Sequence, residues 1–168
     1  GYVAPLRAAT LLMREVPATN ATILDAGCGT GLVGEVLSDN GYNDIDALDY
    51  SQDMLDQAKA KNIYGDYYHA DMNKTLSLND DSYDAVICVG TFTFGHVHPQ
   101  ALNELVRITK PTGTICLTVR DEAYHEFNYR EHMLELEVEK AWELVELRHE
   151  DYIQKENSFC KLCTYRVL

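Results

Sequence analysis

Three closely spaced glycines form the part of the sequence best suited to hold a ligand. The segment runs from Asp25 to Gly31, includes Gly27 and Gly29, and lies between a short apolar run and a segment with helical spacing. Glycine has no Cβ, so a strand–loop–helix junction of this kind lets the backbone approach a ligand at the carboxyl end of a strand, where open α/β sheets bind nucleotides. The loop therefore predicts a nucleotide-like ligand rather than a purely structural turn.

Two carboxylates follow at positions that suit the same ligand. Asp49 ends the next expected strand, 22 residues after Gly27, from where a carboxylate can accept hydrogen bonds from both ribose hydroxyls of an adenosine. Asp71 ends the third expected strand, where a carboxylate can accept from the adenine amino group. The structural alternatives are a turn or cap role for Asp49, and for Asp71 the opening of a loop together with Asn73.

Two classes of cofactor fit these residues. Gly29, Gly31 and Gly34 also match the pattern GxGxxG, with Asp49 20 residues beyond Gly29, so a dinucleotide is one reading. Asp25 argues against it, because this acid would place an anion close to the pyrophosphate. A cofactor that carries an amino group and a sulfonium, S-adenosylmethionine, tolerates the acid well.

The spacing of apolar residues predicts an α/β fold. Apolar runs alternate with segments of helical periodicity, which is typical of a parallel sheet covered by helices. Strands are expected at 22–26, 45–49, 67–70, 85–89 and 114–119, and an antiparallel hairpin at 142–152 and 159–168, seven strands in all. Helices are expected from Leu32 to the Asn40-Gly41 stop, after the cap Ser51, between Pro99 and Pro111, and from Glu122 to Lys140.

Size and charge restrict the function. The 168 residues suit one domain, 1–168, and the apolar run Ala85–Gly90 is far shorter than the ~20 residues that span a membrane. With no signal peptide near Gly1, we expect a cytoplasmic protein, without excluding the nucleus, and no membrane partner. The net charge of −13 disfavours nucleic acid as a substrate, because such binding relies on cationic side chains. The sequence carries no signal for an oligomeric state.

The five cysteines read as reduced thiols. Only Cys160 and Cys163 form a CxxC pair, and residues three apart in a strand point to opposite faces. The pair also lacks the second set of ligands that a zinc site needs, so we expect no metal site.

Several motifs in order resemble those of the class I S-adenosylmethionine-dependent methyltransferases, over nearly the whole chain. They are Ile23–Gly31, Asp49–Ser51, His69–Met72, Tyr83–Val86 and Lys110–Gly113. The resemblance implies a Rossmann-like fold, with a seven-stranded, mostly parallel sheet of order 3-2-1-4-5-7-6 and helices on both faces. It departs from the usual pattern at Thr112, where relatives often have glycine. Such enzymes also usually have an N-terminal segment that closes over the cofactor, which we expect to be lacking here.

The same resemblance implies roles for individual residues. Gly27 and Gly29 would approach the methionine moiety, Asp49 the ribose, Tyr50 and Met72 the faces of the adenine, and Asp71 the adenine amino group. The full set expected to bind the cofactor is Asp25, Gly27, Cys28, Gly29, Asp49, Tyr50, Ser51, Asp71, Met72 and Val89.

The loop Gly90–Pro99, after the fourth expected strand, lies where the transferred methyl should point. Phe92 and Phe94 are candidates to wall an acceptor pocket, with packing of the loop as the alternative. His96 and His98 are its two candidate catalytic bases, with a structural role as the alternative for each. The loop lacks the Asn/Asp-Pro-Pro-aromatic motif, which argues against a nucleobase-amino or glutamine acceptor.

The leading hypothesis is a methyltransferase that acts on a small molecule mainly by positioning it. A protein methyltransferase and a non-catalytic S-adenosylmethionine-binding interaction protein are the alternatives. A nicotinamide-dependent oxidoreductase is a further option.

Overall fold

The computed structural model describes residues 1–168 and contains one seven-stranded sheet, with order β3-β2-β1-β4-β5-β7-β6. The predicted fold class and strand order are therefore confirmed. The strands are β1 (Ile23–Ala26), β2 (Ile45–Asp49), β3 (Tyr67–His69), β4 (Tyr83–Phe92), β5 (Thr109–Arg120), β6 (Trp142–Ile153) and β7 (Ser158–Val167). The helices are α1 (Ala4–Glu15), α2 (Leu32–Asp39), α3 (Gln52–Lys59), α4 (Ala101–Ile108), α5 (Asp121–Glu126) and α6 (Tyr129–Val138), followed by the 3₁₀ turn Gln154–Glu156.

The first five strands are parallel and the last two form the predicted antiparallel hairpin. β1 pairs with β2 and β4, β2 with β3, and β4 with β5, all in parallel. β7 is antiparallel to both β5 and β6. The apolar segment Ala85–Val89 of β4 is buried on both faces, as a central parallel strand must be. Parallel strands end on the same side, so the residues after β1, β2 and β4 meet at one edge of the sheet.

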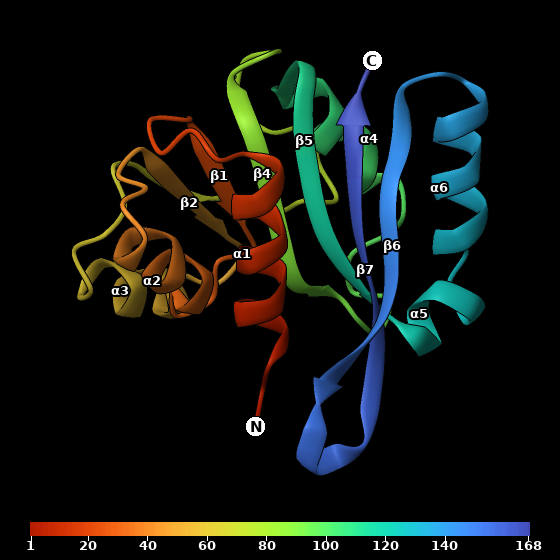
Figure 1. The fold of residues 1–168 in the computed structure, drawn as a ribbon, viewed down its shortest axis with the longest axis horizontal. Helices are drawn as coiled ribbons and strands as arrows, with labels where there is room; N and C mark the ends of the chain where they lie inside the picture. Colours follow the sequence, from red (N-terminus) through yellow and green to blue (C-terminus); the bar gives the residue numbers. More distant parts are fainter.

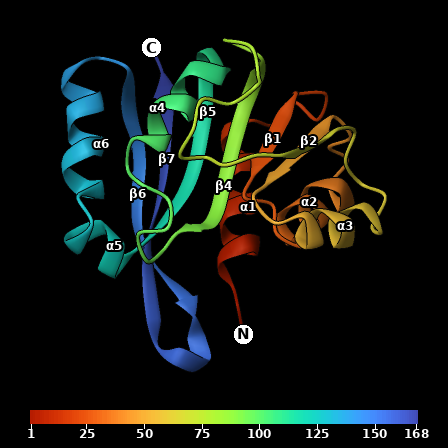
Figure 2. The same ribbon diagram turned by 180° about the vertical axis from the view of Figure 1, so that it is seen from behind.

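Helices cover both faces of the sheet, each over its own apolar core. One core joins α1, α2 and α3 to the sheet, and the other joins α4, α5 and α6 to it. Figure 1 shows α1 crossing in front of the sheet, and Figure 2 shows α4 on the opposite face. The alternation of β7 places Cys160 in the first core and Cys163 in the second, so the two cysteines lie on opposite faces.

Several local features differ from the sequence prediction, and one is that β4 continues to Phe92, into the segment expected to be a loop from Gly90. The single helix expected at 122–140 is broken into α5 and α6, because Asn128 adopts the left-handed conformation with φ 64°. The break allows Tyr129 to be fully buried, with its hydroxyl donating to the carbonyl of Val97. The motif Lys110–Gly113 lies inside β5 rather than before it, with Thr112 at φ 69°. Helix α1 was not expected.

No helix is both long and apolar enough to cross a membrane.

Candidate active site

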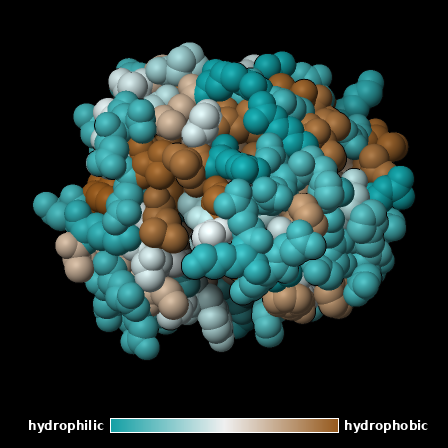
Figure 3. Space-filling view, turned by 60° about the horizontal axis from the view of Figure 1, so that its bottom comes forward, coloured by the Kyte–Doolittle hydropathy of each residue, from teal (hydrophilic) through white to brown (hydrophobic).

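A cavity of about 710 Å³ lies at the carboxyl ends of β1, β2 and β4. Figure 3, in which the lower end of Figure 1 comes forward, shows apolar surface gathered among polar side chains on this end of the molecule. Nine of the ten residues expected to bind the cofactor line the cavity: Asp25, Gly27, Cys28, Gly29, Asp49, Tyr50, Asp71, Met72 and Val89. The tenth, Ser51, lies outside it and caps α3 by accepting a hydrogen bond from the amide of Met54 at 3.3 Å.

The glycine loop is shaped by two different requirements. Gly27 has φ +68°, and a Cβ built there would lie 2.0 Å from Oγ1 of Thr91, so the ends of β1 and β4 could not approach this closely with any other residue. Gly29 has φ +56°, but a Cβ built there meets no atom within 4 Å. The space beside Gly29 is therefore open. It is room that a ligand can fill and a side chain would obstruct.

Asp49 holds the glycine loop as well as facing the cavity. Its Oδ2 accepts a hydrogen bond from the amide of Gly29 at 2.8 Å, and its Oδ1 accepts one from the amide of Ser51 at 2.9 Å. An ionised carboxylate has about four lone-pair sites, so two remain for hydroxyl donors of a ligand. The structural and the binding interpretations of Asp49 are thus compatible.

Asp25 is a buried carboxylate with one unsatisfied oxygen. It is 1% exposed; its Oδ2 accepts from the hydroxyl of Tyr64 at 2.6 Å, while its Oδ1 is buried without a partner. Burial raises the pKa of Asp25 to about 7, and the negative charge of Asp49 adds to the rise. The hydrogen bond from Tyr64 lowers the pKa but does not outweigh burial. The group is poised to accept a hydrogen bond from a cationic donor in the cavity.

The position of Tyr64 depends on Gly34, the last glycine of the loop pattern. A Cβ built at Gly34 would lie 2.3 Å from the Tyr64 hydroxyl oxygen. The absence of a side chain at Gly34 therefore lets Tyr64 reach Asp25. Sequence reasoning noted Gly34 only as part of a dinucleotide pattern and missed Tyr64, which carries no local signal.

Asp71 and Asn73 connect the cavity to the loop after β4. Asp71 Oδ1 accepts from the amide of Asn73 at 2.9 Å, so the loop-opening interpretation of Asp71 holds while the residue also lines the cavity. The side chain of Asn73 donates to the carbonyl of His96 at 2.8 Å and accepts from the amide of His98 at 2.7 Å. Asn73 therefore fixes the segment expected to face the acceptor, a role that sequence reasoning did not assign.

The structure separates the candidate residues of that segment. His96 lines the cavity and His98 does not, and both are exposed. Phe92 is 1% exposed and packs on Tyr129 with ring centroids 5.2 Å apart, whereas Phe94 is exposed. Neither phenylalanine lines the cavity; Phe92 packs the end of β4 onto α6, which is the packing alternative, and a role of Phe94 at an acceptor stays a prediction. The cavity is lined instead by residues that the prediction did not include, among them Tyr2, Pro5, Leu32, Val33, Met54 and Thr91.

The sequence of this central region decides the family. Residues 24–117, more than half of the chain, match the methyltransferase domain family. The chain belongs to this family. Its sheet order is also the one that the resemblance to S-adenosylmethionine-dependent methyltransferases predicted. The matched residues contain the glycine loop, Asp49, Asp71 and the loop after β4, which are the parts that build the cavity.

Of three curated relatives of this methyltransferase-domain chain, two have an acceptor in their names, and the two acceptors differ. Methyltransferase-like protein 27 of Homo sapiens is 37% identical over 122 residues, covering 71% of this chain and 49% of that protein. Malonyl-[acyl-carrier protein] O-methyltransferase of Buchnera aphidicola is 37% identical over 110 residues, 65% of this chain and 44% of that protein. The 18S rRNA (guanine-N(7))-methyltransferase of Bos taurus is 39% identical over 67 residues, 40% of this chain and 24% of that protein. The chain spans about half the length of the first two.

Solved structures confirm the fold. The 1,6-didemethyltoxoflavin-N1-methyltransferase of Burkholderia thailandensis, solved with S-adenosylhomocysteine bound, superposes with a TM-score of 0.77 at 18% identity. The match covers 99% of this chain and 79% of that one. At this identity the likeness concerns the fold alone.

Proposed function

We propose that this methyltransferase-domain chain binds S-adenosylmethionine and transfers its methyl group to a small-molecule acceptor. The observation that carries the proposal is Asp25, a buried carboxylate whose Oδ1 has no partner and which lines the cavity beside the open space at Gly29. A cofactor with an amino group and a sulfonium supplies the donor and the positive charge that this acid lacks. The residues present therefore fit S-adenosylmethionine.

The remaining contacts follow from the placement of the lining residues. Asp25 would accept from the amino group, the loop Gly27–Gly29 would lie against the methionine moiety, and Asp49 would accept from the ribose hydroxyls with its free lone pairs. Asp71 would accept from the adenine amino group, with Tyr50 and Met72 on the faces of the ring. When bound, the cofactor supplies a methyl group on a sulfonium. The chain holds the acceptor in line with that methyl and excludes water, which accounts for much of the rate acceleration.

His96 is the candidate base, because it is the histidine of the loop after β4 that lines the cavity. It would remove a proton from an amine or hydroxyl acceptor. His98 points its backbone amide at Asn73 and lies outside the cavity, so it is the natural control.

A small-molecule acceptor is favoured over RNA by charge. The chain carries 27 acidic and 14 basic residues, which gives the net charge of −13, whereas RNA binding gains affinity from cationic side chains. The name of the Buchnera relative gives malonyl-[acyl-carrier protein] as its acceptor, which is not a nucleic acid and agrees with the choice against RNA. A protein side chain is the next candidate acceptor, and a cofactor-binding interaction protein without turnover is the alternative from another class.

The test has two steps. Calorimetric titration with S-adenosylhomocysteine should show saturable binding, whereas titration with NAD should show none. Incubation with radiolabelled S-adenosylmethionine in cell extract should then place the label in the small-molecule fraction. Label in protein or in RNA would show that the acceptor is a macromolecule of that class and not a small molecule. Binding without transfer would favour the non-catalytic interaction protein. Absence of S-adenosylhomocysteine binding would overturn the proposal as a whole.

A further inference from the structure

An arginine at the end of β5 has a buried guanidinium nitrogen without a hydrogen bond. Arg120 is the last residue of β5, its side chain is 13% exposed, and its Nε is buried and unpartnered. Its ion-pair contact is long: Oε2 of Glu122 lies 3.5 Å from Nε. Burying a charged donor without a hydrogen bond costs free energy, so an acceptor brought to this nitrogen would be stabilising.

Two aromatic rings hold this guanidinium in place. The Cζ of Arg120 lies 4.8 Å from the ring centroid of Phe94 and 5.2 Å from that of Tyr152. Rings attract a cation through their faces and leave its N–H groups, which project from the edge of the planar guanidinium, free to donate. The exposed Phe94, which does not line the cavity, thus has a place in the site.

Tyr152 connects Arg120 to the cavity. Its hydroxyl accepts from the hydroxyl of Tyr2 at 3.3 Å, so its own hydrogen is free to donate. A Cβ built at Gly90 would lie 2.5 Å from the Tyr2 hydroxyl oxygen and 3.2 Å from that of Tyr152, so both hydroxyls lie against Gly90. Tyr2 and Gly90 line the cavity. Arg120 is therefore one aromatic ring away from the cavity wall.

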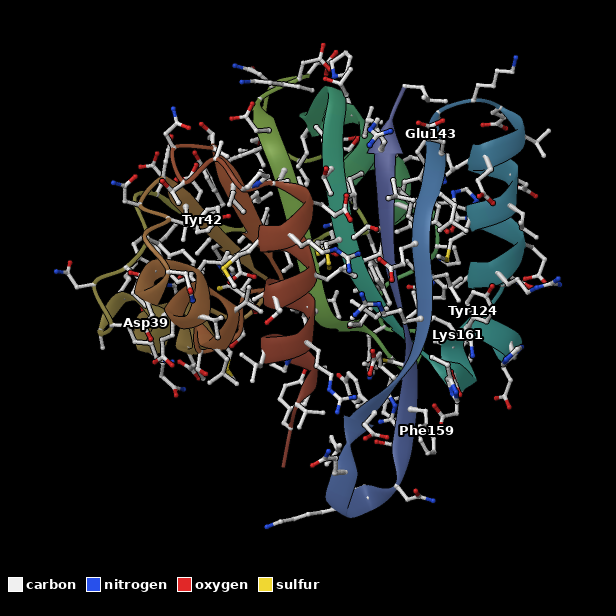
Figure 4. All side chains as sticks on the ribbon, in the orientation of Figure 1. Asp39, Tyr42, Tyr124, Glu143, Phe159 and Lys161 are labelled. Atoms are coloured by element: carbon white, nitrogen blue, oxygen red, sulfur yellow. The ribbon has the colours of Figure 1, made fainter.

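Of the two acids that follow Arg120 in the sequence, Asp121 already has other partners. Its Oδ2 is hydrogen-bonded to Nε2 of His149 at 2.8 Å, and its Oδ1, which has no hydrogen bond, lies 3.3 Å from Nζ of Lys161. Figure 4 shows Lys161 of β7 close to Tyr124 of α5, and its Nζ lies 5.7 Å from that ring centroid, so Lys161 contacts both Asp121 and Tyr124. Glu122 is the acid in ion-pair contact with Arg120, and its side chain is 47% exposed and free to turn into solvent.

We propose that Arg120, together with the hydroxyls of Tyr2 and Tyr152, binds an oxyanion of the acceptor, a carboxylate or a phosphate, and so selects anionic small molecules. That the bound anion is the methyl acceptor rests on the proposed function. Binding of an anion by Arg120 does not depend on it. A carboxylate presents two coplanar oxygens and a phosphate presents a cluster of oxygens. The planar fork of N–H donors on the guanidinium matches either group in geometry and charge.

The test uses matched probes that differ in charge. The protein, with and without saturating S-adenosylhomocysteine, is titrated with benzoate, phenyl phosphate and neutral benzamide, and the Nε–H resonance of Arg120 and the amide of Gly90 are followed by NMR. The two anions should shift both resonances in a saturable manner, and benzamide should not. A response to only one of the anions tells carboxylate from phosphate and supports the proposal equally.

Variants assign the effect to the guanidinium. R120Q should weaken anion binding about 10-fold or more, and R120K should weaken it less, because it keeps the charge but loses the fork. E122Q, which removes the competing carboxylate, should bind the anion at least as tightly as the unmodified chain. The ligand-free melting temperature of each variant separates a loss of binding from a loss of folding.

Equal binding of benzamide, or anion shifts that persist in R120Q, would overturn the proposal. Failure of S-adenosylhomocysteine to bind would overturn the proposed function while the anion titration of the ligand-free protein still decides the role of Arg120. The two failures are therefore distinguishable.

Discussion

The carboxylate of Asp49 joins the ends of β1 and β2, because its Oδ2 accepts a 2.8 Å hydrogen bond from the amide of Gly29. Its Oδ1 accepts from the amide of Ser51, at the start of α3. One side chain thus fixes the glycine loop and faces the cavity. Loss of this carboxylate should affect both the fold and the affinity for the cofactor.

Asp49→Ala is expected to weaken binding of S-adenosylhomocysteine by about 10-fold to 150-fold, since hydrogen bonds to a charged group contribute ~1.5 to 3 kcal/mol. It should also lower the free energy of unfolding by about 1 to 3 kcal/mol, because two backbone amides lose their acceptor. The control is Asp46→Ala on the same strand: Asp46 accepts from the amide of Asp66 and the hydroxyl of Tyr83, outside the cavity. The Asp46→Ala variant should lose stability but keep its affinity for S-adenosylhomocysteine. Calorimetry and thermal denaturation measure the two effects, and equal affinities in both variants would remove Asp49 from the site.

Gly29→Ala is expected to abolish most of the affinity for S-adenosylhomocysteine, because the new methyl group enters the open space beside the loop. Gly41→Ala is the matched control, since Gly41 has φ +92°, its built Cβ meets only Thr19 at 3.8 Å, and it lies away from the cavity. Both variants should lose about 1 to 2 kcal/mol of stability through the left-handed backbone. Comparable affinity for S-adenosylhomocysteine in the two variants would show that the bound ligand does not occupy the space beside Gly29.

Asp25 should make cofactor binding depend on pH. Its pKa is raised to about 7 in the ligand-free protein, and a nearby ammonium would lower it, so binding releases a proton below that pH. The affinity for S-adenosylhomocysteine should therefore rise with pH, by up to about 10-fold per unit, and level out above about pH 7. Asp25→Asn should bind more weakly and with a flat pH profile. A flat profile in the unmodified chain would contradict the role of Asp25.

The same group should influence the stability of the ligand-free protein with the opposite sign. The folded-state pKa of Asp25 is higher than the unfolded value of 3.8. Protonation of Asp25 therefore contributes fully to the free energy of unfolding below about pH 3.8, and this contribution is lost as the pH rises through about 7. Asp25→Asn should remove this loss and raise the ligand-free melting temperature at about pH 8. Tyr64→Phe removes the hydrogen bond that lowers the pKa of Asp25, and should shift the midpoint of the binding profile to higher pH.

His96 and His98 give the sharpest test of acid–base chemistry. If His96 removes a proton from the acceptor, His96→Ala should lower kcat by roughly 10²-fold or more with unchanged cofactor affinity. His98→Ala should leave kcat nearly unchanged, because the side chain lies outside the cavity and its amide still binds Asn73. Near-normal turnover of His96→Ala on the acceptor would mean that catalysis is by positioning alone.

The sequence by itself determined the alternation of strands and helices and the side of the cavity, and the resemblance of its motifs to the S-adenosylmethionine-dependent methyltransferases implied the strand order. Alternating apolar runs and helical segments, the three glycines and the two strand-end acids are local patterns, and the carboxyl ends of parallel strands must share one edge. That is why nine of the ten expected residues line one cavity. The helix break at Asn128 escaped prediction, because the segment keeps helical spacing and only the burial of Tyr129 requires the break.

Only the tertiary structure decided which residues complete the site. Tyr64 reaches Asp25 across 39 positions, Asn73 reaches His96 across 23, and the hydroxyl of Tyr2 reaches that of Tyr152 across 150. Such contacts have no periodicity or spacing in the sequence, because they arise when separate elements pack together. For the same reason the sequence could not tell that Phe92 is buried, that His98 lies outside the cavity, or that Arg120 is left with an unpartnered nitrogen.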